Sequence, residues 1–318
     1  MNHGGQREMG AILIACCAVG ALIVAVTIAP GRVGGPEGPA PLKAASEEYG
    51  KRLVMETSLL LGPDAPDPAM RYAGNRLACA SCHIGAGADP GTLSLATALS
   101  RYPRSSPRSN SEESIQDRVN GCMMRSMNGR ALPEDSPEMI AMVAYLRFLI
   151  DQDAAMGASR REATETPPLR APNRAADLKA GERVFKQRCA ACHQDDGLGL
   201  PASSDPMDGY VFPPLWGPDS FNDGAGMHRV LTAARFIKAR MPLGRADLTD
   251  DEAFDVSAFI NSKPRPEMAG LDADYPDKTM KPVDAGFPPF ADSFPLEQHR
   301  FGPFAPIEAY YKGLKKGK

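Results

Sequence analysis

The sequence predicts a mainly α-helical fold built from two small domains in tandem, and three observations support this. A five-residue pattern, C-x-x-C-H, occurs twice, at 79–83 and 189–193. Each copy lies between stretches whose apolar residues recur at helical spacing. A mostly polar, Pro-containing stretch at 157–174 separates the two halves and is typical of a linker. A chain of 318 residues has room for two ordinary domains, so we expect one motif in each.

The repeated motif is the attachment sequence for c-type haem. Its two thiols add to the two vinyl groups of the porphyrin, and the adjoining His reaches the iron as proximal ligand. A zinc site of four thiolates usually needs neighbouring ligand pairs, and a redox dithiol does not need the His in both copies. We therefore expect two covalently bound haem c groups. The attachment residues are Cys79, Cys82, Cys189 and Cys192, and the proximal iron ligands are His83 and His193.

The composition argues against a nucleic-acid partner and against a disulfide framework. The formal net charge is −3 and charged residues make up 24% of the chain, so no global basic field would attract nucleic acid. Of the 7 cysteines, four belong to the motifs, Cys16 and Cys17 lie in an N-terminal apolar run, and Cys122 stands alone. No even set remains for disulfides. Covalent haem attachment itself implies a protein that matures outside the cytoplasm.

The N-terminal segment, 1–41, predicts a membrane-spanning helix followed by a tether. Residues 10–30 form an uncharged apolar run of about 21 residues, about 31 Å long as a helix, which suffices to span a bilayer. No good small-residue cleavage site follows, and residues 31–41 are rich in Gly and Pro. We expect an uncleaved anchor that holds the protein on the periplasmic side of the inner membrane. The alternative is a cleaved export signal and a soluble periplasmic protein.

The first haem domain is expected at 42–156. An amphipathic helical pattern runs from 42 to 61 and stops at a Gly-Pro pair, and a short helix is expected at 92–99. Ser136 begins a closing helix as its N-cap, with Pro137 at the first position. Helix, motif, loops and closing helix follow in the order of a class I cytochrome c domain.

The second haem domain, 175–264, repeats this order. Helical patterns cover about 177–188 and 227–239, and T-D-D-E at 249–252 is a capping box that begins the closing helix. The tail, 265–318, contains many Pro and aromatic residues and little periodicity. We expect it to form an extended strap packed on the haem domains.

The second axial ligand of each iron sets its potential and reactivity. For the second haem we favour Met241, which lies in a loop before the closing helix. A thioether ligand favours ferrous iron and raises the potential. Met207 and His228 are the alternatives.

For the first haem the candidate is Cys122. It lies between Arg118 and Arg125, and nearby cations favour the thiolate form of a cysteine. A thiolate ligand would lower the potential of this haem. The alternative ligands are Met123, Met124 and Met127.

Residues from about 70 to 310 resemble the dihaem thiosulfate dehydrogenases, also called tetrathionate synthases. Five separated segments in the right order are far more specific than C-x-x-C-H alone. In chain order they are S-P-R at 106–108, the stretch 117–129 with N-G-C and S-M-N-G, F-P-P-L-W-G at 212–217, F-I-K at 236–238 with M-P-L-G at 241–244, and H-R-F-G-P-F at 299–304.

The resemblance implies an enzyme that couples two thiosulfate ions to tetrathionate and passes two electrons to a c-type cytochrome or a membrane acceptor. It gives Cys122 the role of distal ligand to the catalytic haem, and the family's proposed mechanism makes this cysteine a carrier of substrate sulfur. Thiosulfate binding falls to Arg108, Arg118 and Ser126, and ligation of the second haem falls to Met241.

One position departs from part of the family. Some members place a Lys directly before the methionine ligand and exchange the two ligands with redox state. Arg240 occupies this position here and cannot ligate iron, so such an exchange would need Lys238.

Three other functions remain open at the level of sequence. The same site could reduce tetrathionate in the reverse direction, and a dihaem chain could be a non-enzymatic electron carrier. A dihaem peroxidase would need an open or His-switched peroxide site, for which His228 and His299 offer no clear context.

Overall fold

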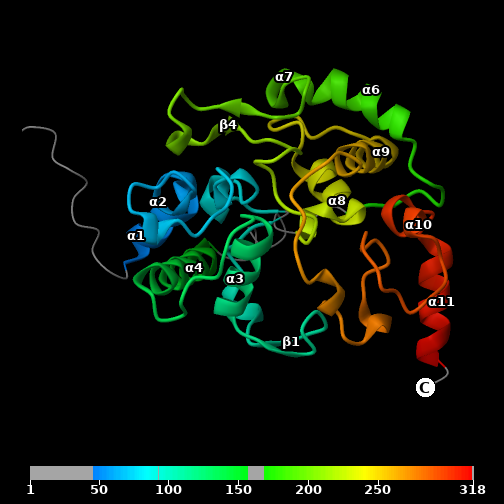
Figure 1. The fold of residues 1–318 in the computed structure, drawn as a ribbon, viewed down its shortest axis with the longest axis horizontal. Coiled ribbons are helices and arrows are strands. Elements are labelled where there is room, and N and C mark those ends of the chain that lie inside the picture. The colour runs from blue at the N-terminus through cyan, green and yellow to red at the C-terminus, as the bar shows by residue number, and fades with distance from the viewer. Residues whose placement is uncertain (1–45, 92, 157–167, 317–318) are drawn as a thin grey trace, which may run out of the picture. The chain divides into compact units, whose positions relative to one another are not determined.

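The structure is a computed structural model that describes residues 46–91, 93–156 and 168–316 (Figure 1). The predicted anchor and tether at 1–41 lie outside the described residues, as does most of the predicted linker. Within the described ranges, no helix is both long and apolar enough to cross a bilayer. All described residues belong to one packed unit, Leu42–Lys318.

The first domain is organised around the contact between α1 (Glu47–Met55) and α4 (Pro137–Met156). Ser46 caps α1 by accepting a hydrogen bond from the Tyr49 N–H, and the predicted cap of α4 is confirmed, since the Ser136 hydroxyl accepts from the Met139 N–H at 3.2 Å. The helix expected at 42–61 is interrupted at Glu56, and a short α2 (Thr57–Leu61) follows. Fully buried apolar side chains on these helices form the domain core: Leu53, Leu61 and Met139.

The prediction of a short helix at 92–99 is wrong for the described residues of that range. They form turns, and only a 3-10 turn at Leu99–Arg101 is helical. Leu93 has a positive φ of 64°. The Ser94 hydroxyl bonds the Gly87 carbonyl and the Ala96 N–H, both at 3.3 Å. Such side-chain bonds to the local backbone compete with helix formation.

Two elements of the first domain were not expected. An antiparallel hairpin pairs β1 (Arg104–Ser106) with β2 (Ser111–Glu113). After it, α3 (Ile115–Arg125) begins with a capping box, because the Ser114 hydroxyl accepts from the Asp117 N–H and the Asp117 carboxylate accepts from the Ser114 N–H. The capping pattern was present in the sequence, so it could have located this helix.

The second domain repeats the plan with α6 (Leu178–Arg188) packed on α9 (Asp250–Asn261). The predicted capping box is confirmed: the Thr249 hydroxyl accepts from the Glu252 N–H, and Glu252 accepts from the Thr249 N–H. Three further elements complete the domain. These are α7 (Ala190–His193), α8 (Val230–Arg240) and an antiparallel pair of β3 (Leu200–Pro201) with β4 (Tyr210–Phe212).

A Gly181→Ala substitution tests the closeness of the α6–α9 crossing. A Cβ at Gly181 would lie 2.1 Å from the Asp255 carbonyl oxygen and 2.8 Å from the Phe259 Cβ. We expect the helices to be forced apart at a cost of about 1–3 kcal/mol of unfolding free energy, measured by thermal unfolding of the holoprotein. Gly313→Ala is the control, since a Cβ there meets nothing within 4 Å. Equal stability of Gly181→Ala and wild type would contradict the packing.

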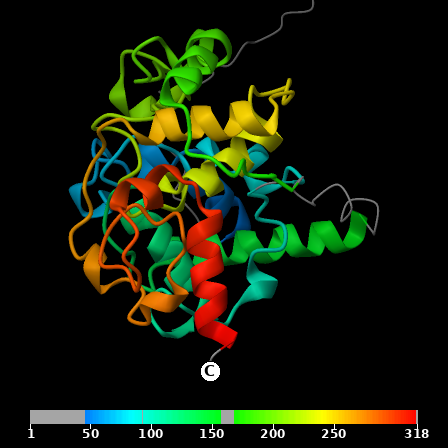
Figure 2. The same cartoon turned by 90° about the vertical axis from the view of Figure 1, so that its right-hand side faces the viewer.

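The tail is only partly the extended strap that we expected. Its first part contains no α-helix and includes short 3-10 turns such as Leu271–Ala273 and Lys278–Met280. It ends in two helices, α10 (Leu296–Phe301) and α11 (Ala305–Lys316), which lie beside the tail loops in Figure 2. The one-sided spacing of buried Ile307 and Tyr311 on α11 was a helical signal in the sequence that we missed.

Asp292 joins α10 and α11 to the tail loop, and its side chain is fully buried. His299 Nε2 lies 3.0 Å from Oδ1, the Phe294 N–H donates to Oδ1, and the Tyr311 hydroxyl donates to Oδ2. Burial acts to raise the pKa of Asp292, but these hydrogen bonds outweigh it and hold the pKa below its usual range. The ionised carboxylate is therefore part of the stable fold.

Substituting Asp292 by Asn should lower stability and flatten its acid dependence. A carboxyl whose pKa is depressed by folding contributes stability above the usual carboxyl pKa, near 4, and loses it as pH falls further. We expect Asp292→Asn to cost about 2 kcal/mol at pH 7 and to narrow the gap between unfolding temperatures at pH 7 and pH 3.5. Glu297→Gln removes an exposed acid from α10 and is the control. An unchanged pH dependence of Asp292→Asn would contradict this role.

Candidate haem centres

The first motif forms a compact turn in which neighbouring groups hold Cys79 and the imidazole of His83. The Thr57 hydroxyl accepts from the Cys79 N–H at 3.1 Å, and the His83 N–H donates to the Cys79 carbonyl. His83 Nδ1 lies 2.6 Å from the Leu93 carbonyl. A carbonyl can only accept, so Nδ1 carries the proton and Nε2 is left as the metal-binding nitrogen. Burial also lowers the pKa of His83, which favours the neutral ligand form.

The second motif has the same design. Cys189 precedes α7, and His193 ends it. His193 Nδ1 lies 2.8 Å from the Pro213 carbonyl, and burial lowers the pKa of His193. Met241 directly follows α8 and packs on the core cluster that also includes Cys189 and Ile237. The imidazole of His193 and the thioether of Met241 are donor types that would hold a haem iron in this domain.

Cys122 lies beside the first motif, although the two are far apart in sequence. Burial is the main reason that the pKa values of Cys79 and Cys82 are raised, and the Cys122 sulfur contributes to both shifts. Arg118 lies one helical turn before Cys122 on α3, and the Cys122 sulfur is the largest cause of the raised pKa of Arg118. Two of the alternative ligands, Met123 and Met127, are buried in the core of the first domain.

The three predicted substrate residues lie around the same helix. Arg108, in the hairpin loop, has its pKa lowered by burial and also by the nearby cations Arg125 and Arg118. Ser126 is the C-cap of α3, one turn after Cys122, and its carbonyl accepts from Asn75 Nδ2. Arg108, Arg118 and Arg125 therefore form one cationic cluster beside the first motif.

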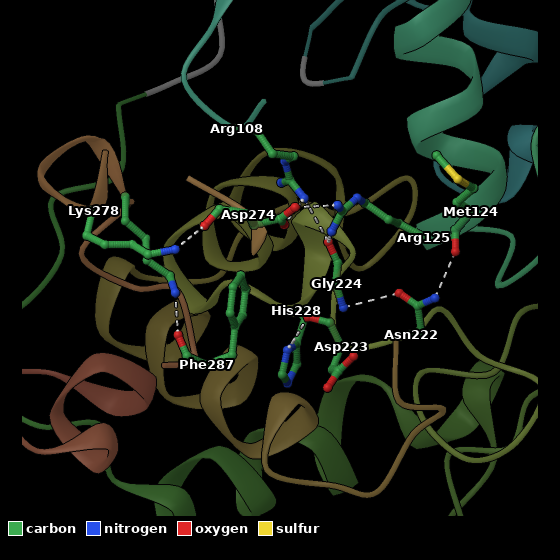
Figure 3. Close-up of polar contacts among 11 residues, drawn as sticks. Arg108, Met124, Arg125, Asn222, Asp223, Gly224, His228, Asp274, Lys278 and Phe287 are labelled. Carbon is green, nitrogen blue, oxygen red and sulfur yellow. Dashed lines mark hydrogen bonds and ion pairs between the residues drawn. The ribbon is translucent and has the colours of Figure 1, made fainter. Parts of the chain in front are cut away.

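A tail carboxylate that the sequence did not single out holds two arginines of this cluster in place (Figure 3). Asp274 accepts from Arg108 at 3.1 Å through Oδ2 and from Arg125 at 2.8 Å through Oδ1. Both arginines also donate to the Gly224 carbonyl. The next residue, Tyr275, donates its N–H to the Arg108 carbonyl, and its ring lies 5.4 Å from the Arg108 guanidinium. Nothing in the local sequence pattern predicted these tail contacts.

The loop from the second domain is tied to α3 in the same region. Asn222 Nδ2 donates to the Met124 carbonyl and to Asn128 Oδ1, and its Oδ1 accepts from the Gly224 N–H. Figure 3 shows this chain of contacts running from Met124 through Asn222 to the Gly224 carbonyl that both arginines share. Segments from both haem domains and the tail therefore position the cationic cluster.

The residues before Met241 are engaged elsewhere. Lys238 Nζ donates to the Leu248 carbonyl at 2.8 Å and lies 3.5 Å from Asp250 Oδ1. Arg240 donates to the Pro90 carbonyl at 2.7 Å and lies 3.3 Å from Asp89 Oδ2. Arg240 thus links the end of α8 to the loop that follows the first motif.

Two helical domains, each with a C-x-x-C-H motif and an oriented imidazole, define a dihaem c-type cytochrome. The family model described as SoxA/TsdA, cytochrome c domain, matches residues 71–150. The model described as cytochrome C oxidase, cbb3-type, subunit III, matches residues 176–260. These matches support one cytochrome c domain on each side of the linker.

Three similar proteins show which family of dihaem cytochromes the chain resembles. The chain is 42% identical over 208 residues to a thiosulfate dehydrogenase of Allochromatium vinosum, covering 64% of this chain and 75% of the relative. It is 39% identical to that of Stutzerimonas stutzeri, covering 64% and 65%. The solved thiosulfate dehydrogenase of Marichromatium purpuratum matches with a TM-score of 0.61 and 33% identity, over 76% of this chain and half of that one. The chain belongs to the thiosulfate dehydrogenase family.

Proposed function

We propose that the protein oxidises thiosulfate to tetrathionate: two S2O3²⁻ ions give one S4O6²⁻ ion and two electrons. The observation that carries this proposal is the lone cysteine, Cys122, flanked by Arg118 and Arg108 beside the first haem motif. When bound, each haem c would accept one electron. The residues that would hold the two groups are Cys79, Cys82, His83 and Cys122 at the first, and Cys189, Cys192, His193 and Met241 at the second.

The arginines meet the main electrostatic obstacle to the reaction. Two dianions must approach closely enough to form a sulfur–sulfur bond, and their repulsion is strong in a partly buried site. Guanidinium groups offer paired N–H donors that match the oxygens of a sulfonate-like group. Arg108 and Arg118 bring two such groups to the site, and Ser126 adds a hydroxyl at the end of α3.

Cys122 acts as the sulfur nucleophile in our proposal. Its thiolate and one thiosulfate form a Cys–S–S–SO3⁻ adduct with the release of two electrons, which bound haem c would accept one at each centre. The sulfane sulfur of a second thiosulfate then attacks the adduct, which forms S4O6²⁻ and releases the Cys122 thiolate. Atoms and charge balance over the two steps, and Arg118 stabilises the thiolate at the start and the end.

The electrons leave, in our proposal, through the second centre to a c-type cytochrome or a membrane acceptor. We also propose that residues 1–41 anchor the protein on the periplasmic side of the inner membrane. Retention of the full chain in washed membranes supports the anchor. A soluble mature protein that begins near residue 30 or later contradicts it.

A steady-state assay of the holoprotein with thiosulfate and ferricyanide tests the function. We expect ferricyanide reduction that depends on thiosulfate, with one tetrathionate formed for every two ferricyanide ions reduced. No thiosulfate-dependent reduction would overturn the enzyme and favour a dihaem electron carrier. A parallel assay with tetrathionate and a reduced viologen dye measures the reverse reaction at the same site.

A further inference from the structure

Arg265, the first residue of the tail, is a partly buried cation with two buried donor atoms that are unused. Its Nε and Nη1 are buried and have no hydrogen-bond partner among the described residues. Only Nη2 is engaged, with the Ile260 carbonyl at 3.0 Å and the Leu215 carbonyl at 3.4 Å. The Phe221 ring covers the guanidinium at 4.3 Å. Burial lowers the pKa of Arg265 to about 10, so the folded chain holds this charge at a cost.

A second arginine, Arg300 on α10, lies near the same point. After burial, the positive charge of Arg300 further lowers the pKa of Arg265. A Cβ at Gly286 would lie 3.3 Å from the Arg300 Cγ and 3.8 Å from the His228 Cε1, which places Arg300 and His228 side by side. The pKa of His228 is lowered to about 4 by burial and then by Arg265 and Arg300. Two guanidinium groups therefore converge around a neutral imidazole.

The carboxylate that attracts Arg265 does not form an ion pair with it. Asp223 attracts Arg265 electrostatically, but its Oδ1 accepts from the Met268 N–H at 2.7 Å. Its backbone carbonyl lies 2.8 Å from His228 Nδ1, as Figure 3 shows. Among the described residues, neither Arg265 nor Arg300 forms an ion pair. Two like charges around the buried, unpaired Nε and Nη1 donors of Arg265 point to an anion that the polypeptide does not supply.

The position of Arg265 beside the core of the second haem domain indicates which anion it binds. Leu215 and Ile260, whose carbonyls accept from Arg265, belong to the packed core around the second motif, together with Cys189 and Met241. Haem c carries two carboxylates, its propionates, and a buried carboxylate is stabilised by guanidinium donors. We propose that Arg265 and Arg300 bind the propionates of the haem in the second domain, so that the two ends of one tail segment complete this haem site.

This pairing would tune the second centre. Cations beside the propionates offset negative charge near the iron, which favours the ferrous state and raises the midpoint potential. Loss of either arginine should therefore lower the potential of the second haem and leave the first haem unchanged. Arg265 and Arg300 are thus positioning and tuning residues, and they touch no substrate.

The test is an EPR-monitored redox titration of the holoprotein carrying Arg265→Gln, Arg265→Lys or Arg300→Gln. Cys122→Gly and Met241→Ala variants assign the signals of the two haems. Arg235→Gln is the matched control, because it removes an exposed arginine from α8 of the same domain. We expect each Gln variant to change the reduction equilibrium of the second haem about tenfold, or about 59 mV for one electron. Arg265→Lys should give a smaller shift in the same direction.

Three outcomes would overturn the proposal. The first is an unchanged second-haem potential in both Gln variants, and the second is an equal shift of both haems, which would indicate a general effect of charge. The third is a raised KM for thiosulfate with unchanged potentials, which would indicate a site for the substrate oxyanion instead. If Arg265→Gln does not incorporate haem, the Arg300→Gln and Arg265→Lys titrations decide the question.

Discussion

Replacing Cys122 by glycine should lower thiosulfate-dependent ferricyanide reduction by roughly 10³-fold or more, the scale seen when a nucleophile is removed. The substitution leaves no sulfur to accept the first substrate, while Arg108 and Arg118 remain to bind it. The loss should therefore fall on kcat. Cys122→Ser should be nearly as inactive, since a hydroxyl beside Arg118 is a far weaker nucleophile than a thiolate.

Spectra distinguish loss of chemistry from loss of haem. Both Cys122 variants should retain two haems by pyridine haemochrome assay, because Cys79, Cys82, Cys189 and Cys192 are untouched. EPR of the oxidised wild type should contain a thiolate-ligated haem signal, and the glycine variant should lack it. A variant with full activity would show that Cys122 is not the nucleophile. A wild type with only His/Met haems would show that it is not an iron ligand.

Replacing Asp274 by alanine should weaken both the fold and substrate binding. Arg108 and Arg125 would keep their mutual repulsion but lose the buried carboxylate that they share. Loss of one partner from a buried ion pair costs several kcal/mol; Arg108 is partly exposed, so we expect about 3 kcal/mol of unfolding free energy here. Arg108 would no longer be held in one orientation, and we expect KM for thiosulfate to rise about tenfold, with a smaller change in kcat.

Asp272→Asn is the matched control for this prediction. Asp272 lies in the 3-10 turn Leu271–Ala273, which directly precedes Asp274, and its side chain is exposed. It should change neither stability nor KM beyond the effect of one surface charge. Asp274→Asn should fall between wild type and alanine, because an amide oxygen can still accept from one arginine. If Asp274→Ala lowers stability while KM stays unchanged, the carboxylate supports the fold without positioning Arg108.

The features that short-range chemistry governs were predictable. Each C-x-x-C-H motif is complete within five residues, and the caps at Ser136 and Thr249 are complete within four. The position of Met241 after α8 also follows from local order along the chain. The roles of Arg108, Arg118 and Ser126 came from the resemblance and remain predictions, although the structure brings the two arginines together near Cys122.

The tail shows what local patterns could not supply. Its Pro-rich composition suggested an extended strap. Instead, α10 buries Phe301 and α11 buries Ile307 and Tyr311 against the second domain. The hairpin of β1 and β2 was missed because its strands lack the alternation of apolar and polar residues that marks a half-buried strand. Its first residue pair is the charged pair Arg104–Glu113.

The chain's linear order alone therefore predicted two haem c attachment motifs, the imidazole that belongs to each, and the starts of the two closing helices. Tertiary structure decided which charges surround each centre. Asp274 lies 149 residues after Arg125, and Arg265 donates to the carbonyl of Leu215, 50 residues earlier. Contacts at such separations depend on how whole domains pack, and no periodicity or spacing records them. In this protein the cysteine and arginines around the first motif come from the first domain, and the carboxylate of Asp274, from the distant tail, pairs with Arg108 and Arg125.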